Sequence, residues 1–213
     1  MARWLFIALT LLASSLSFAQ AKYVEGTNFF RLKEPQPVST GNKIEVLEVF
    51  SYACVHCAHL EPVLQKWRIG MPKNVAFVGL PAVFQEGWAA YARAYYVAQD
   101  LKILDKTHAK LFHAMWEDKK QFQSLDEIAN WYAGFGVTAQ QFKDAFTAKG
   151  LDAKLKRAHE VTPKYEVEGT PTLIIDGKYR FDVTSAGGLE AVPGVLNFLI
   201  QKAATERATK KAS

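Results

Sequence analysis

The sequence predicts an α/β domain that is interrupted by a helical segment. Two apolar, β-branched runs at residues 44–50 and 75–80 flank a stretch of helical periodicity, which is the order strand, helix, strand. Between about residues 88 and 165 no strand pattern occurs. Strand patterns return at residues 172–181. We therefore expect helices inserted between two parts of one sheet-containing domain.

The first residues have the pattern of a secretory signal peptide. Arg3 precedes an apolar run at residues 4–13, and small residues follow up to Ala21. This run is shorter than the roughly 20 apolar residues that a membrane-spanning helix needs. We expect removal of residues 1–19, with cleavage after Ala19 or Ala21, and a mature protein outside the cytoplasm, where disulfides persist.

Residues 20–82 form the first part of the predicted α/β domain. Apolar side chains recur at helical spacing after the first long strand, and glycine and proline end that helix. In chain order we expect a short strand, a loop, a strand, a helix and a strand at residues 28–32, 34–42, 44–50, 54–69 and 75–80.

The rest of the chain divides into an insertion, a second α/β part and a tail. Capping-box sequences at Ser124 and Thr138 help to predict four or five short helices between about residues 88 and 165. Asp176-Gly177 between two β-like runs predicts a hairpin. The expected divisions are a helical insertion, a second α/β part that ends in a helix, and a basic flexible tail, at residues 83–154, 155–204 and 205–213.

Composition restricts the possible functions. Of the 213 residues, 49% are hydrophobic and 13% aromatic, which is enough for a packed core rather than a disordered chain. The formal charge of +5 affects solubility and weak attraction to acidic partners. No basic stripe alternates with aromatic residues, so nucleic-acid binding is not expected.

The chain has only two cysteines, and both lie in Cys54-Val55-His56-Cys57 at the start of the predicted helix. Free N–H groups and the helix dipole at this end favour a thiolate on Cys54, the attacking species in disulfide exchange. Cys57 can then resolve the mixed disulfide. A protonated His56 would stabilise the thiolate further, and stabilising the reduced form makes the disulfide a stronger oxidant.

Other uses of the two cysteines fit less well. Attachment of a c-type haem needs histidine directly after the second cysteine, but Ala58 stands there. Zinc takes four tetrahedral ligands, and one helix cannot wrap Cys54, His56, Cys57 and His59 around a metal. An inert buried pair remains an alternative. We expect no metal and no cofactor besides the Cys54–Cys57 disulfide.

Two segments carry a family resemblance. Phe50-Ser51-Tyr52-Ala53-Cys54-Val55-His56-Cys57-Ala58-His59-Leu60-Glu61 and Gly169-Thr170-Pro171-Thr172 resemble sequences of the DsbA family of periplasmic thiol:disulfide interchange proteins. The resemblance covers about residues 23–202. It implies a thioredoxin-like fold with an inserted helical domain, and a periplasmic location.

The resemblance implies further site residues. Pro171 is expected in the cis form beside the disulfide, with Thr170 offering its backbone to a substrate strand; an ordinary trans proline is the alternative. Val55 departs from the family's frequent Pro-His pair and leaves the reduction potential open.

Two acids are also expected to tune the cysteines. Glu48 matches the family's buried acid beneath the active site, where desolvation would raise its pKa; a solvent-facing strand residue is the alternative. Glu61 is either a second tuning acid or an exposed helix residue. The lysine that pairs with the buried acid in some members has no counterpart in residues 75–80.

The resemblance implies a dithiol oxidase. Its partners would be unfolded or partly folded exported proteins with free thiols, and a quinone-linked membrane reoxidant like DsbB; the protein itself is expected to be a monomer. A periplasmic reductase or isomerase is one alternative. A polypeptide-binding module that does not cycle between redox states is the other.

Overall fold

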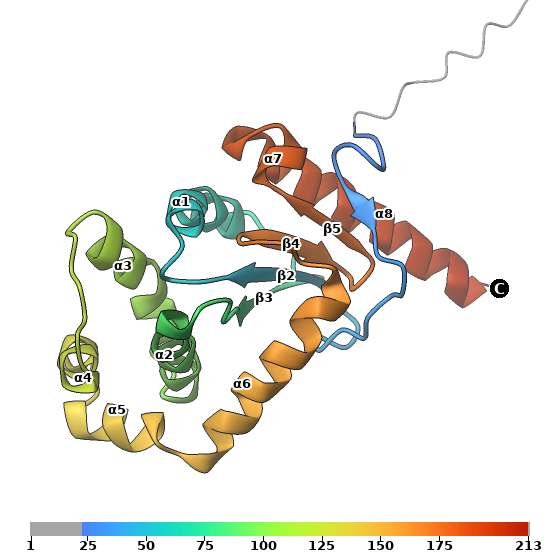
Figure 1. Cartoon of the computed structure of the whole chain (residues 1–213). Coiled ribbons are helices and arrows are strands. Elements are labelled where there is room, and N and C mark those ends of the chain that lie inside the picture. The colour runs from blue at the N-terminus through green and yellow to red at the C-terminus, as the bar shows by residue number, and fades with distance from the viewer. Residues whose placement is uncertain (1–22, 213) are drawn as a thin grey trace, which may run out of the picture.

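The computed structural model describes residues 23–212 and contains a five-stranded mixed sheet (Figure 1). The predicted signal peptide lies outside these residues. Strands β2 and β3 are parallel, and the other neighbouring strands are antiparallel. In the sheet order β1-β5-β4-β2-β3 the strands are Phe30–Arg31, Tyr179–Asp182, Thr172–Ile175, Ile44–Phe50 and Val75–Pro81.

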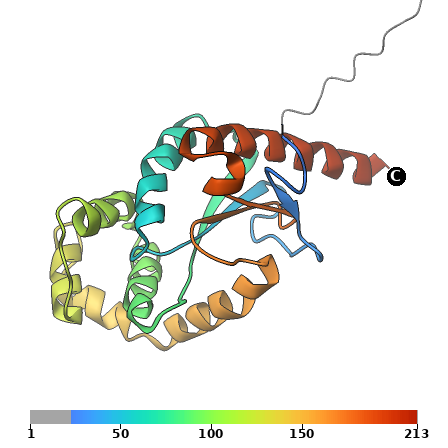
Figure 2. The same cartoon turned by 45° about the horizontal axis from the view of Figure 1, so that its top comes forward.

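Helices cover both faces of the sheet. Figure 2 shows α1 and α8 on one side of the strands and α2 and α6 on the other. Helices α2 to α6 follow β3 and precede β4, which confirms a thioredoxin-like fold with a helical insertion. The α-helices α1 to α8 are Val55–Ile69, Ala89–Asp100, Leu104–Trp116, Leu125–Ala133, Ala139–Phe146, Lys149–Val161, Val183–Ala186 and Val192–Ala212. Among the described residues, none of the helices has the length and apolar character to cross a bilayer.

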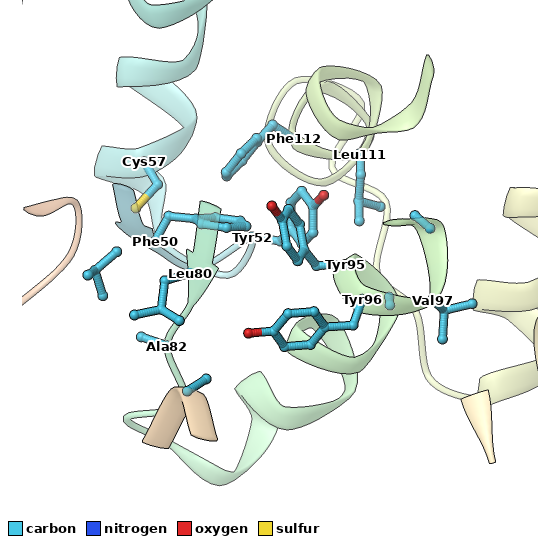
Figure 3. Close-up of a cluster of buried hydrophobic side chains, with 14 of the residues drawn as sticks. Phe50, Tyr52, Cys57, Leu80, Ala82, Tyr95, Tyr96, Val97, Leu111 and Phe112 are labelled. Carbon is cyan, nitrogen blue, oxygen red and sulfur yellow. The ribbon is translucent and has the colours of Figure 1, made fainter. Parts of the chain in front are cut away.

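Strand β2 lies between β4 and β3, and all seven of its residues are buried. Side chains alternate between the two faces of a strand. Ile44 and Val46 accordingly belong to the core against α1 and α8. Leu47 and Val49 belong to the core shared with the insertion. Figure 3 shows this second core, in which aromatic side chains from the end of β2 meet those of α2 and α3.

The local signals in the sequence match the structure closely. Thr138 forms a complete capping box at the start of α5, and Ser124 accepts the Glu127 N–H group at the start of α4. Asp176 and Gly177 both have positive φ, 55° and 62°, which is the requirement of a tight hairpin turn. A Cβ at position 177 would also lie 2.0 Å from the Gln36 carbonyl oxygen, so only glycine fits there.

Two predicted divisions are wrong. Helix α6 runs without a break through residue 154, where the insertion was expected to end. Residues 205–212 are not a flexible tail, because α8 continues to Ala212. The side chain of Arg207 makes an ion pair with the buried Asp176 and donates to the Asn42 carbonyl oxygen at 3.1 Å. These contacts hold the end of α8 against the hairpin.

Candidate active site

The cysteine pair lies where β2 leads into α1. Cys54 is the N-cap residue of α1, in extended conformation, and Cys57 is in its first turn. Both are free thiols. Cys54 keeps 9% of its surface exposed, whereas Cys57 is fully buried. The first cysteine is therefore partly accessible from solvent and the second is not.

The surroundings of Cys54 favour its thiolate. Its pKa falls to about 5 because the Cys57 thiol, the Thr170 side chain and the backbone N–H groups of Cys57 and His56 hydrogen-bond the sulfur, against an opposing effect of burial. Two of these donors are the unpaired amides at the start of α1. The Cys54 thiol is thus ionised at neutral pH.

Cys57 has the opposite character. Burial, its hydrogen bond to Cys54 and the nearby Glu48 charge raise its pKa far above the ordinary thiol value. Val55 is half-buried and His56 exposed beside this pair. Within residues 23–210, no hydrogen bond or ion pair reaches the His56 imidazole, and the groups that stabilise the Cys54 thiolate do not include it. A tuning role for His56 stays a prediction.

The segment before β4 completes the exposed side of the site. The Thr170–Pro171 peptide bond is cis, as predicted. The Cys54 thiol lies 3.3 Å from the Thr170 carbonyl oxygen and donates to it. A groove of about 310 Å³ runs from Thr170 and Pro171 past His56 and His59 to Arg180. Thr170 thus both lines this groove and contacts the Cys54 sulfur.

Glu48 lies beneath the cysteines and is 1% exposed, which confirms that it is a buried acid. Its neighbour across the parallel pair is Gly79, so no lysine faces it from β3. The Tyr95 hydroxyl occupies the space where a side chain at position 79 would begin. Burial and the charge of Glu61 raise the pKa of Glu48 to about 8. Glu48 therefore holds a proton at neutral pH.

Glu61 is also buried, at 3% exposure, so the expectation of an exposed helix residue is wrong. Its Oε1 atom accepts a hydrogen bond from Arg68 at 2.5 Å, in an ion pair two turns along α1. Its Oε2 atom lies 3.6 Å from Nε2 of His108 in α3. Burial raises the pKa of Glu61, and Arg68 opposes this effect. The insertion thus contributes to the site through α3.

Sequence reasoning missed Arg68 and His108. The seven-residue spacing from Glu61 to Arg68 places both on one face of a helix and was a usable signal. His108 has no such signal, because its contacts with Tyr52 and Glu61 arise from tertiary packing. Of two aromatic side chains in the sequence near the site, Tyr52 belongs to the core at 1% exposure, whereas Phe84 is 45% exposed and packs against Trp88.

Comparisons with known proteins identify the family. Residues 74–193 match the family model described as a DSBA-like thioredoxin domain. The chain is 34% identical to the thiol:disulfide interchange protein DsbA of Pseudomonas aeruginosa, over 89% of this chain and 88% of that protein. It is 36% identical to the protein of that name from Pseudomonas syringae pv. tomato, over 99% of both.

Solved structures of DsbA proteins are also similar to this chain. The crystal structure of Pseudomonas aeruginosa DsbA matches with a TM-score of 0.81 and 34% identity, covering 89% of this chain and 97% of that one. The oxidoreductase DsbA from Xylella fastidiosa matches with a TM-score of 0.79 and 31% identity, covering 85% and 98%. This chain therefore belongs to the DsbA family of thiol:disulfide oxidoreductases.

Proposed function

We propose that this protein is an exported dithiol oxidase that donates its Cys54–Cys57 disulfide to newly exported proteins. The observation that carries this proposal is the opposite character of the two sulfurs. The pKa of Cys54 is lowered to about 5 and that of Cys57 is raised. A stabilised thiolate favours the reduced enzyme, so the oxidised enzyme readily gives its disulfide away.

The reaction begins when a client thiolate attacks the Cys54 sulfur. The Cys54–Cys57 bond breaks, a client–Cys54 disulfide forms, and Cys57 leaves as a thiolate that takes up a proton. A second client thiol then loses its proton and attacks the client sulfur, which releases Cys54 as a thiolate. The client gains one disulfide, and the enzyme gains two electrons and one proton, which balances the proton that the second client thiol loses.

We assign roles to the residues on this basis. Cys54 exchanges with the client and Cys57 is the leaving thiolate, while Thr170 and Pro171 support a client segment along the groove. Glu48 is suited to supply the proton to Cys57, because it is protonated at neutral pH and, once ionised, interacts electrostatically with that thiol. His56 and Val55 remain proposed tuning residues, and Glu61 acts through Glu48.

The partners follow from electron balance. Each turnover leaves a reduced enzyme, so catalysis needs an acceptor for two electrons. A quinone-linked membrane protein of the DsbB kind fits this requirement, and an oxidising compartment outside the cytoplasm fits the predicted signal peptide. The clients are partly folded chains, because their free thiols must reach the Cys54 sulfur, which is the accessible one of the pair.

Oxidation of reduced ribonuclease A tests the proposal. We expect the oxidised protein to restore ribonuclease activity in a stoichiometric reaction, and Cys54→Ser to restore none. If the protein instead reduces insulin with dithiothreitol but leaves ribonuclease reduced, it is a reductase. If Cys54→Ser retains full effect on client folding, the protein is a binding module and the proposal fails.

A further inference from the structure

A buried polar cluster lies below the cysteines and joins three elements of the fold. Glu48 comes from β2, Glu61 from α1 and His108 from α3, and one ligand-type atom of each lies within 4.8 Å of the others. Within residues 23–210, Glu48 Oε2 and Glu61 Oε2 are buried and accept no hydrogen bond. Buried polar atoms without a partner are costly, so the cluster needs an explanation.

The contacts of His108 fix which ring nitrogen carries the hydrogen. The Tyr52 hydroxyl lies 2.7 Å from Nδ1 of His108, and both groups are buried. If Nδ1 donated, the Tyr52 hydrogen would have no acceptor and a bare Nε2 would face the Glu61 carboxylate. If Tyr52 donates to Nδ1, the hydrogen sits on Nε2 and points at Glu61 Oε2. The second arrangement gives the Tyr52 hydroxyl hydrogen an acceptor and turns an N–H group, rather than a lone pair, toward the Glu61 carboxylate.

His108 is neutral in this setting. Burial, assisted by the Arg68 charge, lowers its pKa to about 3. Rings from Phe50, Tyr95 and Phe112 surround it at centroid distances of 5.1–5.9 Å, so the imidazole cannot turn freely. At 3.6 Å its Nε2–H group is too far from Glu61 for a good hydrogen bond, but it presents a positive dipole end to that carboxylate.

Resting on the proposed function, we propose that His108 is a positioning residue for disulfide exchange. The Tyr52 hydroxyl holds the ring so that the Nε2–H group, together with Arg68, favours the ionised form of Glu61. The Glu61 charge then keeps a proton on Glu48 by repelling a second negative charge. In this way α3 of the insertion helps to keep Glu48 ready as the proton donor to Cys57.

The charge arrangement favours a proton rather than a metal ion at this cluster. Arg68 places a permanent positive charge 2.5 Å from Glu61 Oε1, which opposes a bound cation. Glu61 also lines a crevice of about 370 Å³ between α1 and α3. The titratable and charged groups that act on the cluster from the packed elements are Cys54, Cys57, Arg68, Tyr52, Tyr95 and Tyr132.

The test is an infrared titration of Glu48 in the oxidised full-length mature protein. The carboxylic acid band of Glu48 is identified by its loss in Glu48→Gln, and its midpoint is followed with pH in three variants of His108. His108→Phe keeps the ring packing without a polar atom. His108→Asn keeps a group near Tyr52 but none near Glu61. His108→Gln can place an amide N–H group toward Glu61.

We expect the Glu48 midpoint to fall by at least about half a pH unit in His108→Phe and His108→Asn, and to stay near the wild-type value in His108→Gln. The exposed His159 on α6 provides the control, and His159→Phe should leave the midpoint unchanged. An unchanged midpoint in both His108→Phe and His108→Asn would overturn the proposal, as would an equal shift in His108→Gln.

A second measurement addresses the metal alternative, and the readout is independent of the proposed function. Equimolar zinc should leave the wild-type Glu48 band unchanged; loss of the band would show that the cluster binds metal and would overturn the inference. The titration uses no client, so a wild-type protein that fails to oxidise ribonuclease would contradict the proposed function while the role of His108 could still be measured.

Discussion

The active site has a rim and a floor that are built in different ways. The rim comprises Cys54, His56, Thr170 and Pro171, which come from two short contiguous segments, α1's first turn and the loop before β4. The floor comprises Glu48, Glu61 and His108, which come from three separate elements. The difference shows that local sequence specifies the reacting sulfurs, whereas long-range packing controls where the proton is held.

The largest expected effect separates the two cysteines themselves. Cys57→Ser should accumulate a mixed disulfide with scrambled, disulfide-bonded ribonuclease, because its Cys54 thiolate attacks a client disulfide and no second enzyme thiol resolves the product. Cys54→Ser should form none, because Cys57 is fully buried. Non-reducing electrophoresis after acid quenching measures both. Equal trapping by the two variants would show that the sulfurs are equally accessible.

The rim and the floor should give opposite pH dependence of stability. Cys54 has a folded pKa of about 5, below the unfolded thiol value, so its contribution is full above about pH 8.5 and is lost as the pH falls through 5. Glu48 has a folded pKa of about 8, above the unfolded value of about 4.3, so its contribution is full below pH 4.3 and is lost as the pH rises through 8.

Urea unfolding of the oxidised and reduced proteins between pH 5 and 8 measures these contributions. The oxidised protein has no titrating thiol, so we expect its stability to fall with rising pH through Glu48. In the reduced protein, Cys54 should offset this fall by up to about 1.4 kcal/mol per pH unit. If the free energies of unfolding of the oxidised and reduced proteins changed with pH in parallel, a stabilised Cys54 thiolate would be contradicted.

Removing the acid at the floor should slow the step that releases Cys57. We expect reduction of the Glu48→Gln disulfide by glutathione to be about 100-fold slower than wild type at pH 6, the lower range for loss of a general acid. The difference between the two reduction rates should disappear above pH 8, where wild-type Glu48 has lost its proton. Stopped-flow fluorescence gives the rates, and exposed Glu190→Gln is the control. A rate difference between Glu48→Gln and wild type that is the same at every pH would exclude proton donation by Glu48.

The smallest expected effect concerns the rim. Thr170→Val removes a hydroxyl that stabilises the thiolate, and a hydrogen bond to a charged group is worth about 1.5–3 kcal/mol, so the pKa of Cys54 should rise by about 1–2 units. Thiolate absorbance at 240 nm measures this change. Thr184→Val, on an exposed position of the same groove, should change nothing. A similar rise in both variants would point to a general effect on the groove.

The rim could be predicted from the sequence because its signals are short-range. The two-residue spacing of the cysteines and the Thr170-Pro171 pair are visible without a fold, and so are the capping box at Thr138 and the turn at Asp176. Glu48 was predictable only through the family resemblance. The burial of Glu61 depends on α3 packing against α1, and no local pattern carries that information.

The flexible tail was predicted wrongly for the same reason, because the helix at the C-terminal end depends on a contact between residues far apart in the sequence. A basic, polar sequence after residue 204 has the composition of a frayed tail. It is helical because Arg207 reaches Asp176, which is 31 residues away in sequence and buried in the hairpin turn. Composition describes the exposed face of such a helix, and the contact that orders it is visible only in three dimensions.

The equilibrium of the Cys54–Cys57 pair with glutathione tests the central claim most directly. A Cys54 pKa of about 5 stabilises the reduced form about 100-fold at pH 7 relative to an ordinary thiol. We therefore predict a reduction potential at least about 50 mV less negative than the roughly −270 mV of thioredoxin. A potential equal to that of thioredoxin, or more negative, would contradict the assignment of this protein as a disulfide donor.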